Sequence, residues 1–251
     1  VGADAMTSGQ HDLYVGYLPL PAKHRRFMRA CVATIAVALA GAGAVIAALQ
    51  RDPGPAVWNT AEEVTLRGRI SAHPYPSIQT DDGAYLIVEM GKVGSQRRVD
   101  PLHNHDATLA GYLLERAGRR MLELAPGDDA VKDLGESSRI ARVGRPGAEV
   151  ELVGEILDSK CYLGAMKPGD GNAHKACATL CIDGGIPPML YAHSADGDPV
   201  YYILSASDTA PAPESVRDYL AEPVRVRGIP IDAGGLSYLV IDETSIERLG
   251  R

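Results

Sequence analysis

Two short stretches, Val64-Thr-Leu-Arg-Gly-Arg-Ile70 and Val150-Glu-Leu-Val-Gly-Glu-Ile156, decide how this 251-residue sequence is interpreted. Both alternate apolar and polar residues, which is typical of a strand with one buried face. Gly68 of the first stretch corresponds to Gly154 of the second. Glycine in mid-strand favours a bulge or a sharp bend, which lets a short sheet coil into a small barrel.

Each stretch is followed by further strand-like segments in the same order. The matched segments are residues 84–90 and 199–204, then 107–112 and 224–229 with Gly111 matching Gly228, then 120–124 and 236–241. We therefore expect a mainly β protein with two tandem OB-like antiparallel barrels, over residues 61–146 and 147–251. A single antiparallel sandwich, with accidental glycine matches, is the alternative. An OB-like barrel does not by itself identify a function.

An apolar segment precedes the β region. Residues 30–49 carry no charged side chain, and a helix of this length spans a bilayer's hydrocarbon core of roughly 30 Å. Four basic residues stand just before the segment: Lys23, Arg25, Arg26 and Arg29. By the positive-inside rule, residues 1–29 are cytoplasmic, residues 30–50 form a transmembrane helix, and everything after Arg51 is exported. We expect single-pass anchoring in the inner membrane, a Pro/Gly-rich linker over 51–60, and periplasmic β domains.

A cleaved signal peptide is the alternative to an anchor, because residues 40–44 are small enough for a peptidase. The long stretch before the apolar segment favours the anchor. Gly41 and Gly43 would let a partner helix approach closely. The net charge of −7 provides no basic surface for nucleic acid, so we exclude that class of partner.

The second half differs from the first by a long interval between its first two strands, over residues 157–198. Asn172 as an N-cap and Gly184 as a stop predict a short helix over 173–182. On it His174, Cys177 and Cys181 share one face, which Cys161 can reach from the end of the preceding strand.

These residues leave three interpretations open. Exported cysteines normally oxidise, so a disulfide from Cys161 to Cys177 or Cys181 is the first, and it would stabilise by roughly 3 kcal/mol. The second is a metal site in which Cys161, His174, Cys177 and Cys181 bind Zn, Cu or Fe. The third is thiol–disulfide exchange, although the chain has no Cys-x-x-Cys of the thioredoxin kind.

The segment also resembles a group of small exported bacterial domains of unknown function, which pair a strand "GxIxDxxC" with a later "HxxCxxxCxxxG". The matching positions are Gly154, Ile156, Asp158, Cys161, His174, Cys177, Cys181 and, near the last spacing, Gly184 and Gly185. The resemblance covers roughly residues 149–247. It implies a small β-barrel with a cysteine-bearing helix, and it implies no activity.

Other candidate sites are weaker. His103-Asn-His105-Asp106 offers two imidazoles and a carboxylate, but we expect it to be a solvated loop. Asp81–Gly83 and Asp196–Asp198 are typical of hairpin turns.

The chain contains no Ser–His–Asp frame, Walker loop or haem-attachment motif, so enzymatic activity is the least supported hypothesis. We expect a non-enzymatic accessory or assembly subunit of a larger membrane complex, such as an electron-transfer complex. The alternative is a periplasmic metal- or haem-handling protein that uses the Cys/His cluster. The sequence indicates another membrane protein as the partner, and no small-molecule substrate.

Overall fold

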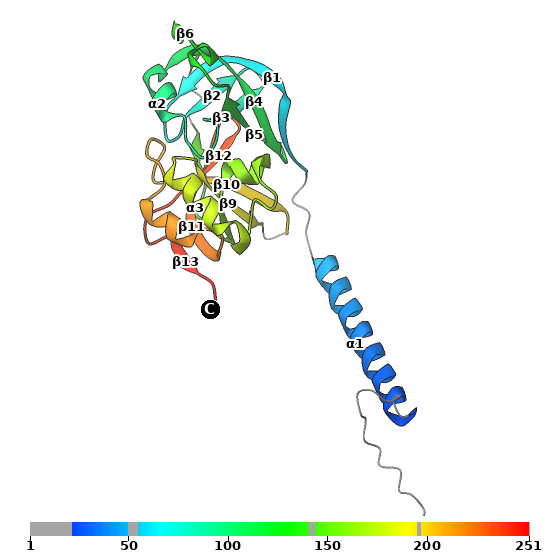
Figure 1. The fold of residues 1–251 in the computed structure, drawn as a ribbon. Helices are drawn as coiled ribbons and strands as arrows, with labels where there is room; N and C mark the ends of the chain where they lie inside the picture. The colour runs from blue at the N-terminus through cyan, green and yellow to red at the C-terminus, as the bar shows by residue number, and fades with distance from the viewer. Residues whose placement is uncertain (1–21, 50–54, 141–143, 195–196, 251) are drawn as a thin grey trace, which may run out of the picture. The chain divides into compact units, whose positions relative to one another are not determined.

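The computed structural model describes residues 22–49, 55–140, 144–194 and 197–250. The described residues belong to two compact units: one helix near the N-terminus, and a β-rich unit that contains all the strands (Figure 1). The protein is therefore mainly β with an apolar N-terminal helix, as predicted. The predictions for residues 1–21, and part of the predicted turn at Asp196, lie outside the described residues.

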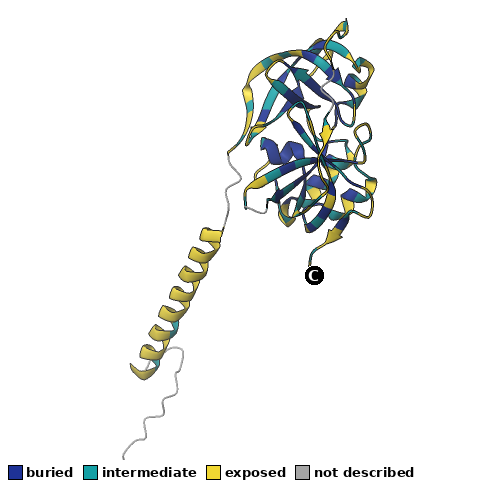
Figure 2. Cartoon of the chain, turned by 180° about the vertical axis from the view of Figure 1, so that it is seen from behind, coloured by how far each residue is buried: buried dark blue, intermediate teal, exposed yellow. Residues whose placement is uncertain are grey.

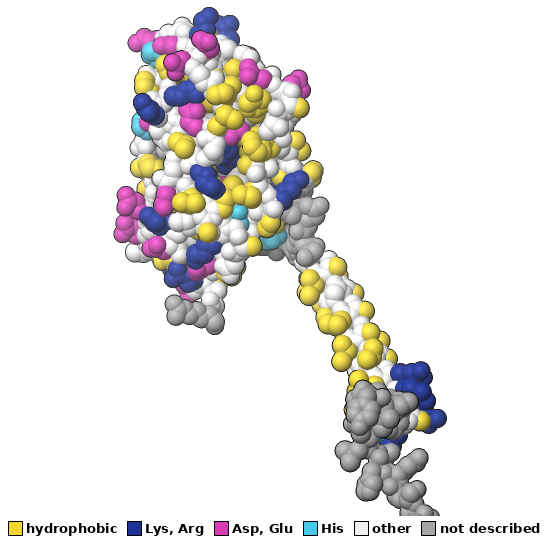
Figure 3. Space-filling view, in the orientation of Figure 1, with side chains coloured by type: hydrophobic (Ala, Val, Ile, Leu, Met, Phe, Trp, Pro, Cys, Tyr) yellow, Lys and Arg dark blue, Asp and Glu magenta, His cyan; other side chains and the backbone are white. Residues whose placement is uncertain are grey.

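Helix α1 (Ala22–Leu49) is long and apolar enough to cross a membrane, as a membrane anchor or a signal sequence would be. None of its residues is buried (Figure 2). Hydrophobic side chains cover it, and basic side chains gather at its N-terminal end (Figure 3). The helix begins eight residues earlier than predicted, since Lys and Arg are good helix formers and continue it backwards from the apolar segment.

The first sheet contains the strands β1 (Ala56–Ser71), β2 (Ser77–Thr80), β3 (Gly83–Val88), β4 (His105–Arg116), β5 (Arg119–Leu124) and β6 (Val131–Glu136). The strand order is β1-β2-β3-β5-β4-β6, and β1 also pairs with β4, so five strands close into a barrel. Strands β3 and β5 are parallel and the other pairs are antiparallel. Helix α2 (Gln96–Val99) and a 3-10 turn (Asp100–Leu102) connect β3 to β4.

The second sheet contains β7 (Arg145–Pro146), β8 (Val150–Asp158), β9 (Pro188–His193), β10 (Pro199–Ser205), β11 (Pro223–Ala233), β12 (Leu236–Val240) and β13 (Ile246–Arg248). Its pairings follow the sequence β8-β9-β10-β12-β11, and β11 pairs back with β8. Strands β10 and β12 are parallel, as β3 and β5 are in the first sheet. Helix α3 (Lys175–Asp183) lies between β8 and β9.

The matched glycines occupy equivalent places in the two sheets. A Cβ atom on Gly68 would lie less than 3.0 Å from the carbonyl oxygen of Gln79 on β2, and one on Gly154 would approach Tyr191 on β9 in the same way. The second matched pair, on β4 and β11, shows the same close approach to β5 and β12. Glycine is needed at these positions because the neighbouring strand crosses where a side chain would stand.

Four clusters of buried side chains form the core of the described β unit, and the smallest contains Leu157 and Tyr162. One lies within the first sheet, around Ile70 and Leu122, and a second lies within the second sheet, around Ile156 and Leu239. The third contains residues of both sheets, including Leu86 and Tyr238. The two sheets therefore bury apolar surface against each other and share one compact unit (Figure 2).

One predicted boundary is wrong. Residues 56–60 were expected to be linker, but they form the first part of β1. Ala56–Asn59 pair with the end of β4, and Trp58 Nε1 donates a hydrogen bond to Glu123 Oε2 at 3.1 Å. Val57 and Trp58 have high β propensity, and here that preference prevails over the Pro/Gly-rich stretch before them.

Candidate metal centre

The cysteine-bearing segment begins where β8 ends. The chain turns through Ser159 and Lys160 into a short helical segment, Cys161–Ala165, and then reaches α3. Helix α3 starts two residues later than predicted, because Asn172 begins a separate 3-10 turn and its side chain caps no backbone N–H. Gly185, with φ of 93°, follows the helix and allows the chain to turn into β9.

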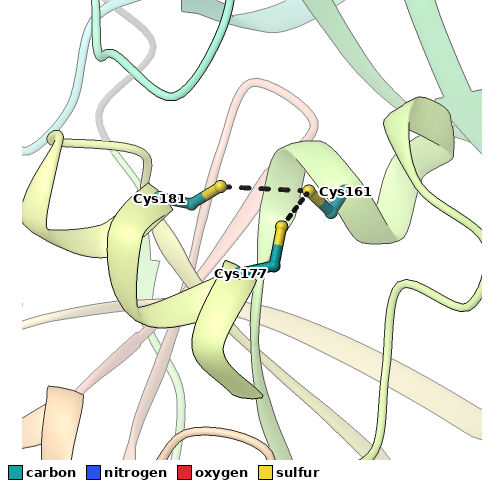
Figure 4. Close-up of side chains that lie close together, drawn as sticks. All are labelled: Cys161, Cys177 and Cys181. Atoms are coloured by element: carbon teal, nitrogen blue, oxygen red, sulfur yellow. Dashed lines mark hydrogen bonds between the residues drawn. The ribbon is translucent and has the colours of Figure 1, made fainter. Parts of the chain in front are cut away.

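The structure brings the three cysteines of the β unit together. Cys161 Sγ lies 3.9 Å from Cys177 Sγ and 3.9 Å from Cys181 Sγ. The three side chains point toward one another, one from the turn after β8 and two from α3 (Figure 4). Cys161 and Cys181 are buried, whereas Cys177 is half-buried. We call this group the thiol cluster.

The predicted disulfide is not formed. All four cysteines, including Cys31 of α1, are free thiols. A disulfide requires an S–S distance near 2.05 Å, about half the separation found within the thiol cluster. The spacing along the chain correctly predicted that the three sulfur atoms lie near one another. It does not predict whether any two of them are bonded.

His174 lies near Cys161 but makes its hydrogen bond to a carboxylate. Its Nε2 lies 2.7 Å from Asp158 Oδ2, and both side chains are almost fully buried. The other carboxylate oxygen of Asp158 accepts a hydrogen bond from the backbone N–H of Cys161 at 2.8 Å. His174 therefore holds Asp158, and Asp158 holds the turn that carries Cys161. The ligand atoms of these three residues lie within 4.8 Å of one another, so they form a second group that could hold a cation.

Lys92 also contacts the thiol cluster, and the sequence analysis missed it. It comes from the loop after β3, in the first half of the β unit, and its Nζ lies 2.6 Å from Cys177 Sγ and 3.7 Å from Cys181 Sγ. The loop is fixed against the end of α3, where the Gly94 N–H donates to the Gly184 carbonyl oxygen at 2.8 Å. A Cβ atom on Gly184 would collide with the Lys92 carbonyl oxygen, so glycine is required there.

A second lysine anchors the same loop from the other side. Lys160, next to Cys161, is buried and donates hydrogen bonds to the carbonyl oxygens of Glu89 and Gly91, each at 2.7 Å. Its Nζ also lies 2.5 Å from Glu123 Oε1, so the buried charge is paired. The residue beside the first cysteine thus positions the loop that carries Lys92. No local pattern predicts these contacts, because the partners are 37 to 71 residues away in the chain.

The surroundings of the thiol cluster favour a thiolate at Cys181. A hydrogen bond from Cys161 lowers the pKa of Cys181, and the charge of Lys92 lowers it further, against the opposing effect of burial. The same hydrogen bond raises the pKa of Cys161, and burial and the Asp158 carboxylate add to that rise. The pKa of Lys92 is raised mainly by its hydrogen bond with Cys177. The cluster therefore places the thiol whose pKa is lowered near an ammonium group.

The sulfur separations match those of thiolates around one ion. Two sulfur ligands at about 2.3 Å from a common ion are about 3.8 Å apart in a tetrahedron and about 4.0 Å apart in a trigonal plane. The two separations from Cys161 Sγ are both 3.9 Å. The ligand atoms of all three cysteines lie within 4.8 Å of one another, so one ion can reach all of them after small side-chain rotations.

The weaker histidine candidates are not brought together. The Nδ1 atom of His103 accepts a hydrogen bond from the Ala72 N–H at 3.1 Å, while His105 pairs with Asp133 at 2.9 Å. Asp106 accepts a hydrogen bond from a serine hydroxyl instead.

Comparisons with protein families, with curated proteins and with solved structures found no match for this chain.

Proposed function

We propose that this chain is a membrane-anchored, exported protein that binds a thiophilic metal ion through Cys161, Cys177 and Cys181. The observation that carries the proposal is the convergence of three sulfur atoms from two separate elements, with Cys161 Sγ 3.9 Å from each of the other two. Three sulfur donors beside the ammonium group of Lys92 form a set of ligands that suits a soft metal ion.

The sulfur ligands favour some metal ions over others. Thiolate sulfur is the preferred donor for Cu(I) and Zn(II), whereas Mg²⁺ and Ca²⁺ prefer oxygen. Three thiolates with Zn(II) carry a net charge of −1, and with Cu(I) a net charge of −2. The ammonium group of Lys92 offsets one negative charge in either case. An electrostatic partner beside the site thus favours the fully deprotonated, metal-binding form.

The coordination favours an exchangeable ion over a purely structural one. Structural zinc sites usually have four protein ligands, whereas sites with three keep an open position. His174 is held by Asp158, which leaves three cysteines as the ligands that converge. Cys177 is half-buried, so the open position lies on the accessible side of the thiol cluster. These features fit a protein that receives or passes on a metal ion.

The surrounding fold fits the same proposal. We interpret both rings of five strands as OB-like barrels in tandem, within residues 56–136 and 145–248, because each has the same order of pairings and one parallel pair. The cysteines belong to the second barrel and Lys92 to the first. We propose the periplasmic side of an inner membrane as the location, with residues 1–29 in the cytoplasm. The resemblance to exported cysteine-bearing domains agrees with that location.

An accessory role in a larger membrane complex is the second candidate function. The observation that favours it is the exposed surface of α1, on which Gly41 and Gly43 have no neighbouring atom within 4 Å. Such glycines let two helices approach closely within a bilayer. Co-purification of the tagged full chain with a stable membrane partner, lost in a Gly41→Leu/Gly43→Leu variant, would support this role. A partner that remains bound to that variant would contradict it.

The metal proposal is tested on full-length protein purified from membranes without reductant. Elemental analysis and a thiol count under denaturing conditions are made on the same sample, followed by anaerobic titration with Cu(I) or Zn(II). We expect about one metal ion per chain and at least a tenfold loss of affinity in Cys177→Ser. Cys31→Ser is the matched control and should bind normally. If the fully reduced protein binds neither ion, the proposal is wrong.

A further inference from the structure

A pocket of about 500 Å³ lies between the two sheets of the β unit. Ile70, Pro74 and Ala84 line it from the first half, and Ile231, Leu236 and Tyr238 line it from the second. None of the residues of the thiol cluster belongs to its lining. The pocket is thus separate from the candidate metal centre. Its volume falls within the range of about 300–1,000 Å³ that is typical of sites for small organic ligands.

Two polar groups in the wall have no partner among the described residues. Ser205 is fully buried, and its hydroxyl group makes no hydrogen bond. The Nε of Arg69 is also buried without an acceptor, although its guanidinium group donates to Asn104 through another nitrogen. Leaving a buried polar group unsatisfied costs about 1–3 kcal/mol. A ligand with hydrogen-bonding atoms at these positions would recover that free energy.

The charged groups of the lining are mostly cationic or basic. Arg69, His73 and His103 lie on the wall that comes from the first half, and the two imidazole rings are 5.0 Å apart. Burial lowers the pKa of His103, and the charges of His73 and Arg69 lower it further. Asp100 faces both histidines, and burial raises its pKa. The lining itself contains a single carboxylate, that of Asp208, which is exposed.

We propose that this pocket binds a small amphipathic organic anion. The apolar body lies between Ile70 and Leu236, which face the pocket from opposite halves. The anionic head, a carboxylate or a phosphate, accepts hydrogen bonds from Arg69 and from the Nε2–H of His103, whose Nδ1 accepts a hydrogen bond from the Ala72 N–H. The hydroxyl of Ser205 bonds a polar atom of the body. Because the wall comes from both sheets, the ligand also holds the two halves of the β unit together.

The proposal is tested with the full chain in nanodiscs, using 2-naphthoate as the probe and the neutral 2-naphthalenemethanol as its matched analogue. Binding is measured by titration calorimetry and by ligand-observed NMR. We expect 2-naphthoate to bind at least tenfold more tightly than the alcohol. Arg69→Gln should abolish this difference, while Arg67→Gln, an exposed arginine outside the pocket lining, should preserve it.

A second variant distinguishes the loss of a ligand contact from the loss of the folded pocket. Ser205→Ala removes the unpartnered hydroxyl, so its free energy of unfolding should be unchanged or raised. It should also abolish a several-fold preference for 6-hydroxy-2-naphthoate over 2-naphthoate, because only the hydroxynaphthoate has a polar atom on its body for the Ser205 hydroxyl. No binding of 2-naphthoate at about 5 mM to folded protein would overturn the proposal, because pockets of this size bind such fragments more tightly than that. Equal binding of the anion and the alcohol would overturn it as well.

Discussion

Replacing Lys160 with methionine should lower the free energy of unfolding of the β unit by about 3–5 kcal/mol. Lys160 and Glu123 have side chains only 3% and 2% exposed, and their charged atoms are 2.5 Å apart. Methionine keeps most of the side-chain volume but removes the ammonium group, so the carboxylate of Glu123 would stay buried without its counter-ion. The carbonyl oxygens of Glu89 and Gly91 would also lose their donor.

The assay is urea unfolding of the full chain, followed by the fluorescence of its single tryptophan. Trp58 is a suitable reporter because its ring N–H donates to Glu123, the partner of Lys160. Lys175→Met is the matched control. It removes a lysine that pairs with Glu222 but is 38% exposed, and an exposed pair of this kind contributes about 0–1 kcal/mol.

A loss in Lys160→Met no larger than in the control would refute the reasoning, since it would mean that the Glu123 carboxylate does not depend on its buried partner. The double variant Lys160→Met/Glu123→Leu provides an independent check. It removes both charges, so it should be more stable than Lys160→Met alone. A double variant that loses the sum of both single effects would show that the two groups are not coupled.

Three further predictions concern the thiol cluster and the pocket. Lys92→Met should weaken Cu(I) or Zn(II) binding about 10–100-fold in a competition titration, whereas exposed Lys132→Met should not, because only Lys92 contacts the sulfur atoms. Gly184→Ala should displace the loop that carries Lys92, because the added Cβ atom would collide with that loop. Circular dichroism should show a folded protein, and the competition titration should show a loss of metal affinity as large as in Lys92→Met. Unchanged affinity would contradict the close approach. The pKa of His103 in the folded protein lies below its ordinary value, so below about pH 6.5 the unfolded chain binds more protons than the folded one. The free energy of unfolding therefore decreases as the pH falls through that range. His103→Gln should remove this part of the pH dependence in unfolding experiments, and an identical pH profile in the variant would contradict it.

The strand pattern of both halves could be predicted because its causes are local. Gly68 and Gly154 mark the places where a neighbouring strand crosses, and alternation on either side identifies the buried face. The apolar helix could also be predicted from a local feature, the uncharged segment of residues 30–49. Its start at Ala22 was not, since helix propensity continues beyond the apolar residues. The resemblance to small exported domains remains a prediction.

The details of the candidate site depend on contacts that no local pattern encodes. The spacing of Cys161, Cys177 and Cys181 predicted that the three sulfur atoms meet, and they do. Lys92 was missed because it lies 85 residues before the cysteine that it contacts. His174 shares a helix face with two cysteines in sequence, yet a buried carboxylate nearby binds it more directly than the sulfur atoms do.

The shared core between the sheets and the pocket beside it were also missed. Each half buries an alternating face inside its own ring of strands, and the same pattern is expected for two independent barrels. Leu86 and Leu163 lie in the core that both halves share, but in the sequence they cannot be told from residues of a barrel interior. The packing of one half on the other follows from surface shape, which the hydrophobic pattern does not specify.

X-ray absorption spectroscopy of the metal-loaded full chain tests the central claim most directly, because it counts the atoms bound to the ion. The proposal predicts three sulfur neighbours at about 2.3 Å, with at most one light atom in an open fourth position. The Cys177→Ser protein should lose one sulfur neighbour. A first shell of nitrogen and oxygen atoms, or reduced protein that retains no ion, would contradict the claim that the three cysteines form a metal site.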